Sequence, residues 1–125
     1  MKKAFFIIPA IVLIVFFIFL AGQHQEAITC SGNITLEGIT FTFTNETNNA
    51  LGTCYRDDRF GIKHVTFRTN RDVTEFRKTC NHEMLHFYLN NAWNDPSYVK
   101  EHEFIDQVID YVNFPICEEL IGLCR

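Results

Sequence analysis

The chain has 125 residues, in which 11 lysines and arginines face 15 aspartates and glutamates, so its formal net charge is −4. This length suggests one domain. The lack of a basic patch argues against a nucleic-acid partner. The first 22 residues differ in kind from the remainder of the chain.

Residues 1–22 predict a transmembrane signal anchor or a signal peptide. Two lysines precede residues 4–22, a 19-residue uncharged run interrupted only by Pro9. As a helix, such a run spans roughly 28 Å, close to the hydrocarbon thickness of a bilayer. The basic end is expected to stay inside, so residues 23–125 would form an extracytoplasmic domain on a single-pass anchor. Small residues at the end of the run leave cleavage possible, in which case the protein would be secreted.

The cysteines are consistent with an extracytoplasmic location. All five follow the hydrophobic run, and an odd number allows two disulfides and one free thiol. We expect Cys30 to pair with Cys54, and Cys80 to pair with Cys117 or Cys124.

Two N-glycosylation sequons are also consistent with an extracytoplasmic location. Asn33-Ile34-Thr35 and Asn45-Glu46-Thr47 each match the acceptor triplet for N-glycosylation. Asn33 and Asn45 are therefore candidate glycosylation sites.

The first half of the domain predicts a small sheet. Residues 23–29 resemble a linker, and residues 33–44 alternate apolar residues with threonines, which predicts strand structure broken near Gly38. Residues 45–60 are rich in turn formers and predict a loop. Residues 61–69 predict a further strand whose polar face favours an exposed or an edge position.

The second half predicts helices. Asp72 followed by Glu75 resembles a capping box and begins a helix over residues 73–90. A second helix is expected from Pro96, with Asp95 as its N-cap, to about residue 113. A short helix or turn should hold residues 117–124. The expected fold is α+β, with a small antiparallel or mixed sheet from residues 33–69 packed on two main helices.

His82-Glu83-Met84-Leu85-His86 is an H-E-x-x-H motif inside the first predicted helix. Positions i and i+4 project from one helical face, so both imidazoles can bind one metal ion. Zn²⁺ is the expected ion, because catalytic zinc sites use three protein ligands and a water whose pKa falls to about 7. Glu83, rotated about 100° from His82 around the helix, would take the proton of that water.

The third ligand should come from Glu101-His102-Glu103 in the next helix. At about 100° per residue, Glu101 lies near the centre of the buried face, His102 near its edge, and Glu103 nearly opposite. His102 ranks first, because Asp106 lies one turn further on and can orient it as a hydrogen-bond partner behind the metal. Glu101 ranks second and Glu103 third.

The motif and its surroundings resemble the zincin metallopeptidases over residues 60–113. The gluzincin branch uses a glutamate from an E-x-x-x-D pattern as third ligand, whereas here His102 occupies that position and Asp106 the aspartate position. The resemblance implies zinc-dependent hydrolysis of a peptide or protein substrate, with Glu83 as general base. It also implies that the strand at 61–69 is a binding edge for an extended peptide.

Two other functions fit the same sequence. One is a binding domain in which zinc stabilises the fold but nothing is cleaved. The other is a surface interaction domain held together by disulfides, without metal. Turnover that depends on Glu83 separates the peptidase from the first, and sensitivity of the melting temperature to a chelator separates it from the second.

Overall fold

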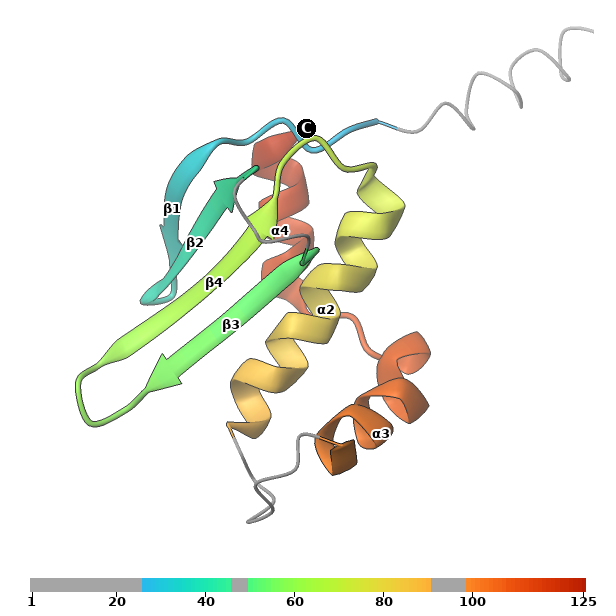
Figure 1. Ribbon diagram of the computed structural model, residues 1–125. Helices are drawn as coiled ribbons and strands as arrows, with labels where there is room; N and C mark the ends of the chain where they lie inside the picture. The colour runs from blue at the N-terminus through green and yellow to red at the C-terminus, as the bar shows by residue number, and fades with distance from the viewer. Residues whose placement is uncertain (1–25, 46–49, 91–98) are drawn as a thin grey trace, which may run out of the picture.

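The computed structural model describes residues 26–45, 50–90 and 99–125, and the predicted N-terminal anchor lies outside these ranges. Within them the chain forms a four-stranded sheet and three α-helices, which confirms the α+β class (Figure 1). The elements are β1 (Gly32–Leu36), β2 (Ile39–Thr44), β3 (Gly52–Asp57), β4 (Ile62–Arg68), α2 (Val73–Leu89), α3 (Val99–Val108), the 3-10 helix η1 (Ile109–Tyr111) and α4 (Pro115–Cys124). No helix among the described residues has the length and hydrophobicity to cross a membrane.

The sheet is mixed, with strand order β1-β2-β4-β3. β1 and β2 form the hairpin expected around Gly38, where Glu37 and Gly38 have φ values of 53° and 75°. Two consecutive positive φ values fit the tight turn that joins twisted antiparallel strands. β2 pairs with β4 in parallel, and β3 pairs with β4 antiparallel.

Two predictions about the sheet were wrong. Residues 45–60 are not all loop, because Gly52–Asp57 form β3. The strand at 61–69 is not at an edge, because β4 lies between β2 and β3. Its polar residues face away from the helices, and a sheet covered on one face allows this even in a central strand. The exposed edge beside the helices belongs to β3.

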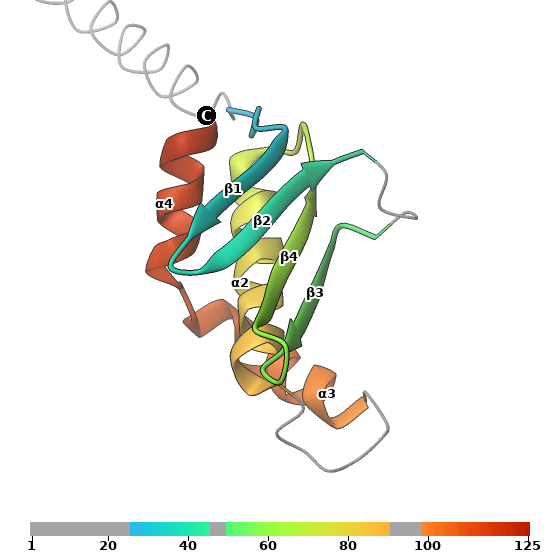
Figure 2. The same ribbon diagram turned by 90° about the vertical axis from the view of Figure 1, so that its left-hand side faces the viewer.

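The core lies between the sheet and the helices on one of its faces (Figure 2). Ile39, Phe41 and Phe43 of β2 are buried, whereas the threonines between them are only half-buried. Phe67 of β4 packs edge-on against Phe76 of α2, with ring centroids 4.9 Å apart. Burying such aromatic rings contributes several kcal/mol in total, at roughly 1.5–3 kcal/mol per side chain.

α2 begins as the sequence predicts. The Asp72 side chain accepts a hydrogen bond from the Glu75 backbone N–H at 2.8 Å. The helix ends at Leu89, where Asn90 adopts a left-handed conformation with φ of 42°, a common C-terminal signal.

The later helices differ from the prediction in their bounds. α3 ends at Val108, and η1 extends the turn only to Tyr111, short of the expected residue 113. The predicted cap Asp95 lies outside the described residues. α4 begins at Pro115, two residues before the expected start, because proline suits the first turn of a helix.

The disulfides are Cys30–Cys124 and Cys80–Cys117, and Cys54 is free. The expected Cys30–Cys54 pair was therefore wrong, and Cys117 is the partner of Cys80. Residues 26–29 are not a free linker either. Ile28 is fully buried, and its backbone pairs with Asn70 and Arg71 just before α2. This pairing brings Cys30 to the C-terminal end of α4.

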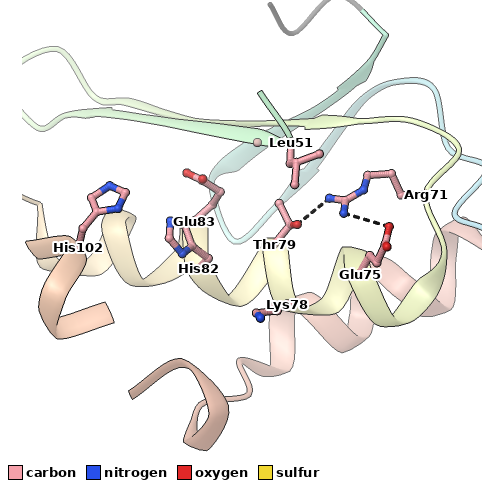
Figure 3. A pocket seen from close by; sticks show the side chains of 9 residues that line it. Leu51, Arg71, Glu75, Lys78, Thr79, His82, Glu83 and His102 are labelled. Atoms are coloured by element: carbon pink, nitrogen blue, oxygen red, sulfur yellow. Dashed lines mark hydrogen bonds and ion pairs between the residues drawn. The ribbon is translucent and has the colours of Figure 1, made fainter. Parts of the chain in front are cut away.

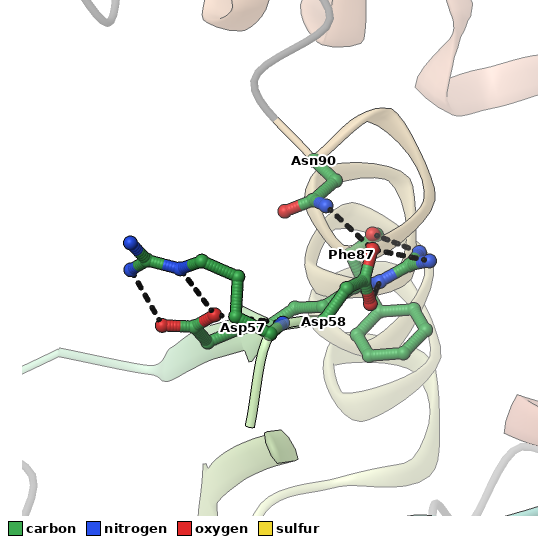
Figure 4. Close-up of polar contacts among 6 residues, drawn as sticks. Asp57, Asp58, Phe87 and Asn90 are labelled. Atoms are coloured by element: carbon green, nitrogen blue, oxygen red, sulfur yellow. Dashed lines mark hydrogen bonds and ion pairs between the residues drawn. The ribbon is translucent and has the colours of Figure 1, made fainter. Parts of the chain in front are cut away.

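The C-terminal end of β3 is fixed to the C-terminal end of α2 (Figure 4). Arg56 donates to the Phe87 carbonyl at 3.2 Å and forms an ion pair with Asp58 at 2.8 Å. Asn90 donates to the same Asp58 carboxylate at 3.4 Å. These contacts hold β3 along α2, so the two elements run in the same direction.

Candidate metal centre

Two of the three predicted metal ligands lie on adjacent turns of α2. The Nε2 atoms of His82 and His86 are 3.2 Å apart. Two nitrogens bound to one tetrahedral zinc at about 2.0–2.1 Å would lie roughly 3.3–3.4 Å apart. The spacing of the rings is therefore close to what a shared ion requires.

The third histidine comes from α3. One ring nitrogen from each of His82, His86 and His102 lies within 4.8 Å of the others, close enough to hold a metal ion. The His102 ring centroid is 4.6 Å from that of His86 and 5.4 Å from that of His82. The Nε2 atom of His102 is also shielded from solvent. An ion here would join α2 to α3.

Glu101 contacts the far side of one ligand. Its buried carboxylate lies 2.5 Å from Nδ1 of His86. A proton on Nδ1 is donated to this carboxylate, which leaves the Nε2 lone pair facing His82 and His102. Glu101, ranked second as a ligand from sequence, thus acts in this geometry as the partner that orients His86.

Glu83 lines a pocket together with His82 and His102 (Figure 3). Its side chain is buried, and burial raises the pKa of the carboxyl group, whereas the nearby His86 lowers it. A cation between the imidazoles would add to the effect of His86 and favour the ionised carboxylate. Gly52 of β3 packs against it, because a Cβ at that position would lie 3.0 Å from Cγ of Glu83.

The surroundings of His82, above all its burial, favour the neutral form of the ring, which is the form that can bind a metal. Burial lowers the pKa of His82 most, and the neighbouring His86 and His102 lower it further. Asp106 opposes them and raises the pKa, so this exposed carboxylate lies near His82. Its expected role as the partner of His102 stays a prediction. Glu103, the third candidate ligand, is exposed.

The centre opens into a pocket of about 540 Å³. Near the histidines it is lined by Leu51, Gly52, Thr79 and Glu83, which belong to the start of β3 and to α2. The pocket continues along α2 towards its N-terminus, where Glu75 and Lys78 line it. An extended ligand therefore has room between the edge strand and the helix.

Sequence reasoning missed two neighbours of the centre. Cys54 faces α2 from β3, and burial raises the pKa of its thiol to about 12, with Glu83 and Glu101 adding to the effect. Gly52 was assigned to a loop, so its contact with Glu83 could not be foreseen. Both depend on the position of β3, which local sequence signals did not reveal.

Neither His64 nor the two predicted glycosylation sites line the pocket. His64 contacts Thr42 at 2.6 Å, between β4 and β2 rather than near α2. Asn33 and Asn45 are exposed, as a glycan-bearing residue must be; glycosylation itself stays a prediction.

Comparisons of the chain with protein-family models, curated proteins and solved structures found no match. The functional argument therefore depends on the geometry and chemistry of the residues described above.

Proposed function

We propose that the protein is a zinc-dependent peptidase whose metal is held by His82, His86 and His102. The observation that carries the proposal is the convergence of three imidazoles beside the buried carboxyl group of Glu83 in an open pocket. Imidazole donors suit zinc among the common divalent ions, and three protein ligands leave one position open, as in catalytic zinc sites.

Bound zinc would supply a Lewis acid that acidifies a water and polarises the carbonyl group to be cleaved. Glu83 would take a proton from the attacking water as its oxygen adds to the carbonyl carbon. The carboxyl group would then give that proton to the amide nitrogen as the C–N bond breaks, leaving a carboxylate and an amine. Burial, which raises the pKa of Glu83, suits a group that must both accept and release a proton.

The remaining contacts support the same role. Glu101 holds His86 with its Nε2 towards the centre. β3 is the last strand of the sheet among the described residues, and an extended peptide could add to its edge as a further strand. β3 thus takes the place that the sequence suggested for residues 61–69. If residues 1–22 form the predicted anchor, the peptidase would act outside the membrane.

The test combines metal analysis with cleavage of unstructured protein substrates by the ectodomain. We expect one zinc per chain and cleavage that Glu83→Gln lowers by at least about 100-fold while the zinc content stays the same. Glu75→Gln makes the same chemical change in the same pocket, two turns away, and should leave cleavage within a few-fold. Stoichiometric zinc without cleavage by the wild type would instead indicate a zinc-stabilised binding domain.

A further inference from the structure

The pocket has a cationic end that the proposed hydrolysis does not use. Arg71, just before α2, lines the pocket although its side chain is only 11% exposed. Its guanidinium group donates to the Thr79 hydroxyl at 2.6 Å and contacts the Glu75 carboxylate at 3.2 Å (Figure 3). A guanidinium group is rarely buried without anionic partners.

The internal partner of this cation can be displaced. The Glu75 side chain is 62% exposed, so its carboxylate can turn into solvent when another carboxylate takes its place. Thr79 and Glu75 accept two of the five N–H groups of the guanidinium. Its planar fork matches a carboxylate in two parallel hydrogen bonds. An incoming carboxylate could therefore replace Glu75 at small cost.

The direction of β3 determines which end of a bound peptide reaches Arg71. β3 begins at Gly52, beside Thr79 and Glu83, and its other end is tied to the C-terminal end of α2. A peptide paired antiparallel to β3, the slightly more stable arrangement, runs the opposite way. Its C-terminal part then passes Gly52 and approaches Arg71.

The spacing of Thr79 and Glu83 along α2 gives the register of a bound peptide relative to Arg71. Thr79, which holds the guanidinium, precedes Glu83 by four residues, or about 6 Å along the axis. An extended chain covers this distance in roughly two residues. The cation therefore lies about two residues beyond the bond that Glu83 would attack.

We propose that Arg71 is a specificity-determining residue that binds a substrate carboxylate about two residues to the C-terminal side of the cleaved bond. The carboxylate can be the free C-terminus of a peptide or the side chain of an aspartate or glutamate. This inference rests on the proposed peptidase function, because it takes the cleaved bond to lie at Glu83.

The experiment measures peptide binding, not turnover, with the zinc-loaded Glu83→Gln protein. The probes are N-acetylated hexapeptides of alanine and leucine in three forms: a free C-terminal carboxylate, a C-terminal carboxamide, and a carboxamide with one glutamate at each position in turn. Calorimetry should show that a carboxylate peptide binds roughly 10- to 100-fold more tightly than the carboxamide. The first and third forms distinguish a free C-terminus from an acidic side chain.

Three further substitutions in the same Glu83→Gln background test the role of Arg71. Arg71→Gln should abolish the preference for a carboxylate, whereas Glu75→Gln should strengthen it by removing the competing carboxylate. Lys78→Gln removes the same charge from an exposed position in the same pocket and should leave most of the preference.

Equal binding of the carboxylate and carboxamide peptides, no binding of either, or an equal loss in the Lys78 and Arg71 variants would overturn the proposal. Because Glu75 is exposed, its variant should fold even if Arg71→Gln does not. If the wild type cleaves no peptide but the Arg71-dependent preference is found, the peptidase assignment fails while the carboxylate site stands.

Discussion

The contact between Gly52 and Glu83 makes a single glycine important for the proposed chemistry. A Cβ at position 52 would lie 3.0 Å from Cγ of Glu83 and 3.1 Å from Cγ2 of Thr79. We expect Gly52→Ala to push the Glu83 side chain by a few tenths of an ångström and to lower cleavage by roughly 10-fold, since small misplacements of catalytic groups slow reactions strongly. Zinc affinity should not change, because none of the three histidines contacts the new methyl group closely.

Gly122 provides the control for this substitution. It lies in α4, where an added Cβ meets nothing within 4 Å. Gly122→Ala should keep full cleavage and increase stability by roughly 0.5–1 kcal/mol, because alanine favours the helix. Equal cleavage by the two variants would show that Gly52 does not control the position of Glu83.

The lowered pKa of His82 predicts how stability and metal binding depend on pH. Burial, then His86 and His102, lower the pKa of His82 below its ordinary value of 6.5. The metal-free folded state thus resists protonation more than the unfolded state does. The stability attributable to His82 is complete above pH 6.5 and is lost as pH falls below it, through the lowered pKa. Zinc should dissociate with the same trend, since a protonated ring cannot bind it.

Denaturant unfolding of the chelated protein, measured across this range, tests the pH prediction. The midpoint should decrease from neutral to weakly acidic pH, and the decrease should be smaller in His82→Asn, which cannot gain the proton. Parallel curves for the two proteins would contradict the assignment of the effect to His82.

At the scale of elements, a buried disulfide holds in place the helix that carries His82 and His86. Cys80, two residues before His82, is bonded to Cys117 of α4 across a separation of 37 residues. The adjacent Asn81 side chain accepts the Phe114 backbone N–H at 2.9 Å, which fixes the start of α4. Replacing both cysteines by alanine should lower the free energy of unfolding by about 3–4 kcal/mol.

Cys54→Ala is the matched control, because it removes a half-buried cysteine that forms no disulfide. This substitution should lower the free energy of unfolding by no more than roughly 1 kcal/mol. Denaturant midpoints under oxidising conditions compare the two proteins. A similar loss in both would mean that cysteine packing, not the covalent bond, is responsible.

The sequence predicted those elements whose signals are local. Asp72 and the apolar pattern after it identified α2, and the direction of the apolar stripe in α3 identified Glu101 as buried. β3 was missed because Gly52 and the acidic pair after it are typical of turns. Its place in the sheet is set by pairing with β4, which no single segment encodes. The same reason explains the wrong edge strand and the wrong partner for Cys30.

The candidate site shows the same difference between features set by local sequence and features set by long-range packing. The H-E-x-x-H spacing depended only on helical periodicity, whereas the ranking of His102 also used Asp106 one turn further on. The structure brings the imidazoles of His82, His86 and His102 together. The contact of Glu101 with His86 requires the relative placement of α2 and α3, so its role could not be distinguished from that of a ligand. Arg71 joins the pocket only because Thr79 holds its side chain there.

At the scale of the whole molecule, metal binding should determine how firmly α3 is attached. Within α3 only Glu101 and Ile105 are buried, whereas α2 and α4 share a disulfide and a large core. A bound ion would link His102 of α3 to the centre on α2, in addition to the contact of Glu101 with His86. Zinc bound at this centre would stabilise the attachment of α3 by an amount that depends on its concentration, about 2.7 kcal/mol at 100 times its dissociation constant.

Hydrogen exchange before and after chelation tests this attachment. We expect the amides of residues 99–108 to exchange up to about 100-fold faster without metal, while those of β2 and β4 keep their protection in the core. His102→Ala should show the same fast exchange in the presence of zinc, since it breaks the link without removing the ion from His82 and His86. Uniformly faster exchange across sheet and helices would instead indicate that the metal stabilises the entire domain, and unchanged exchange would indicate that no ion joins the two helices.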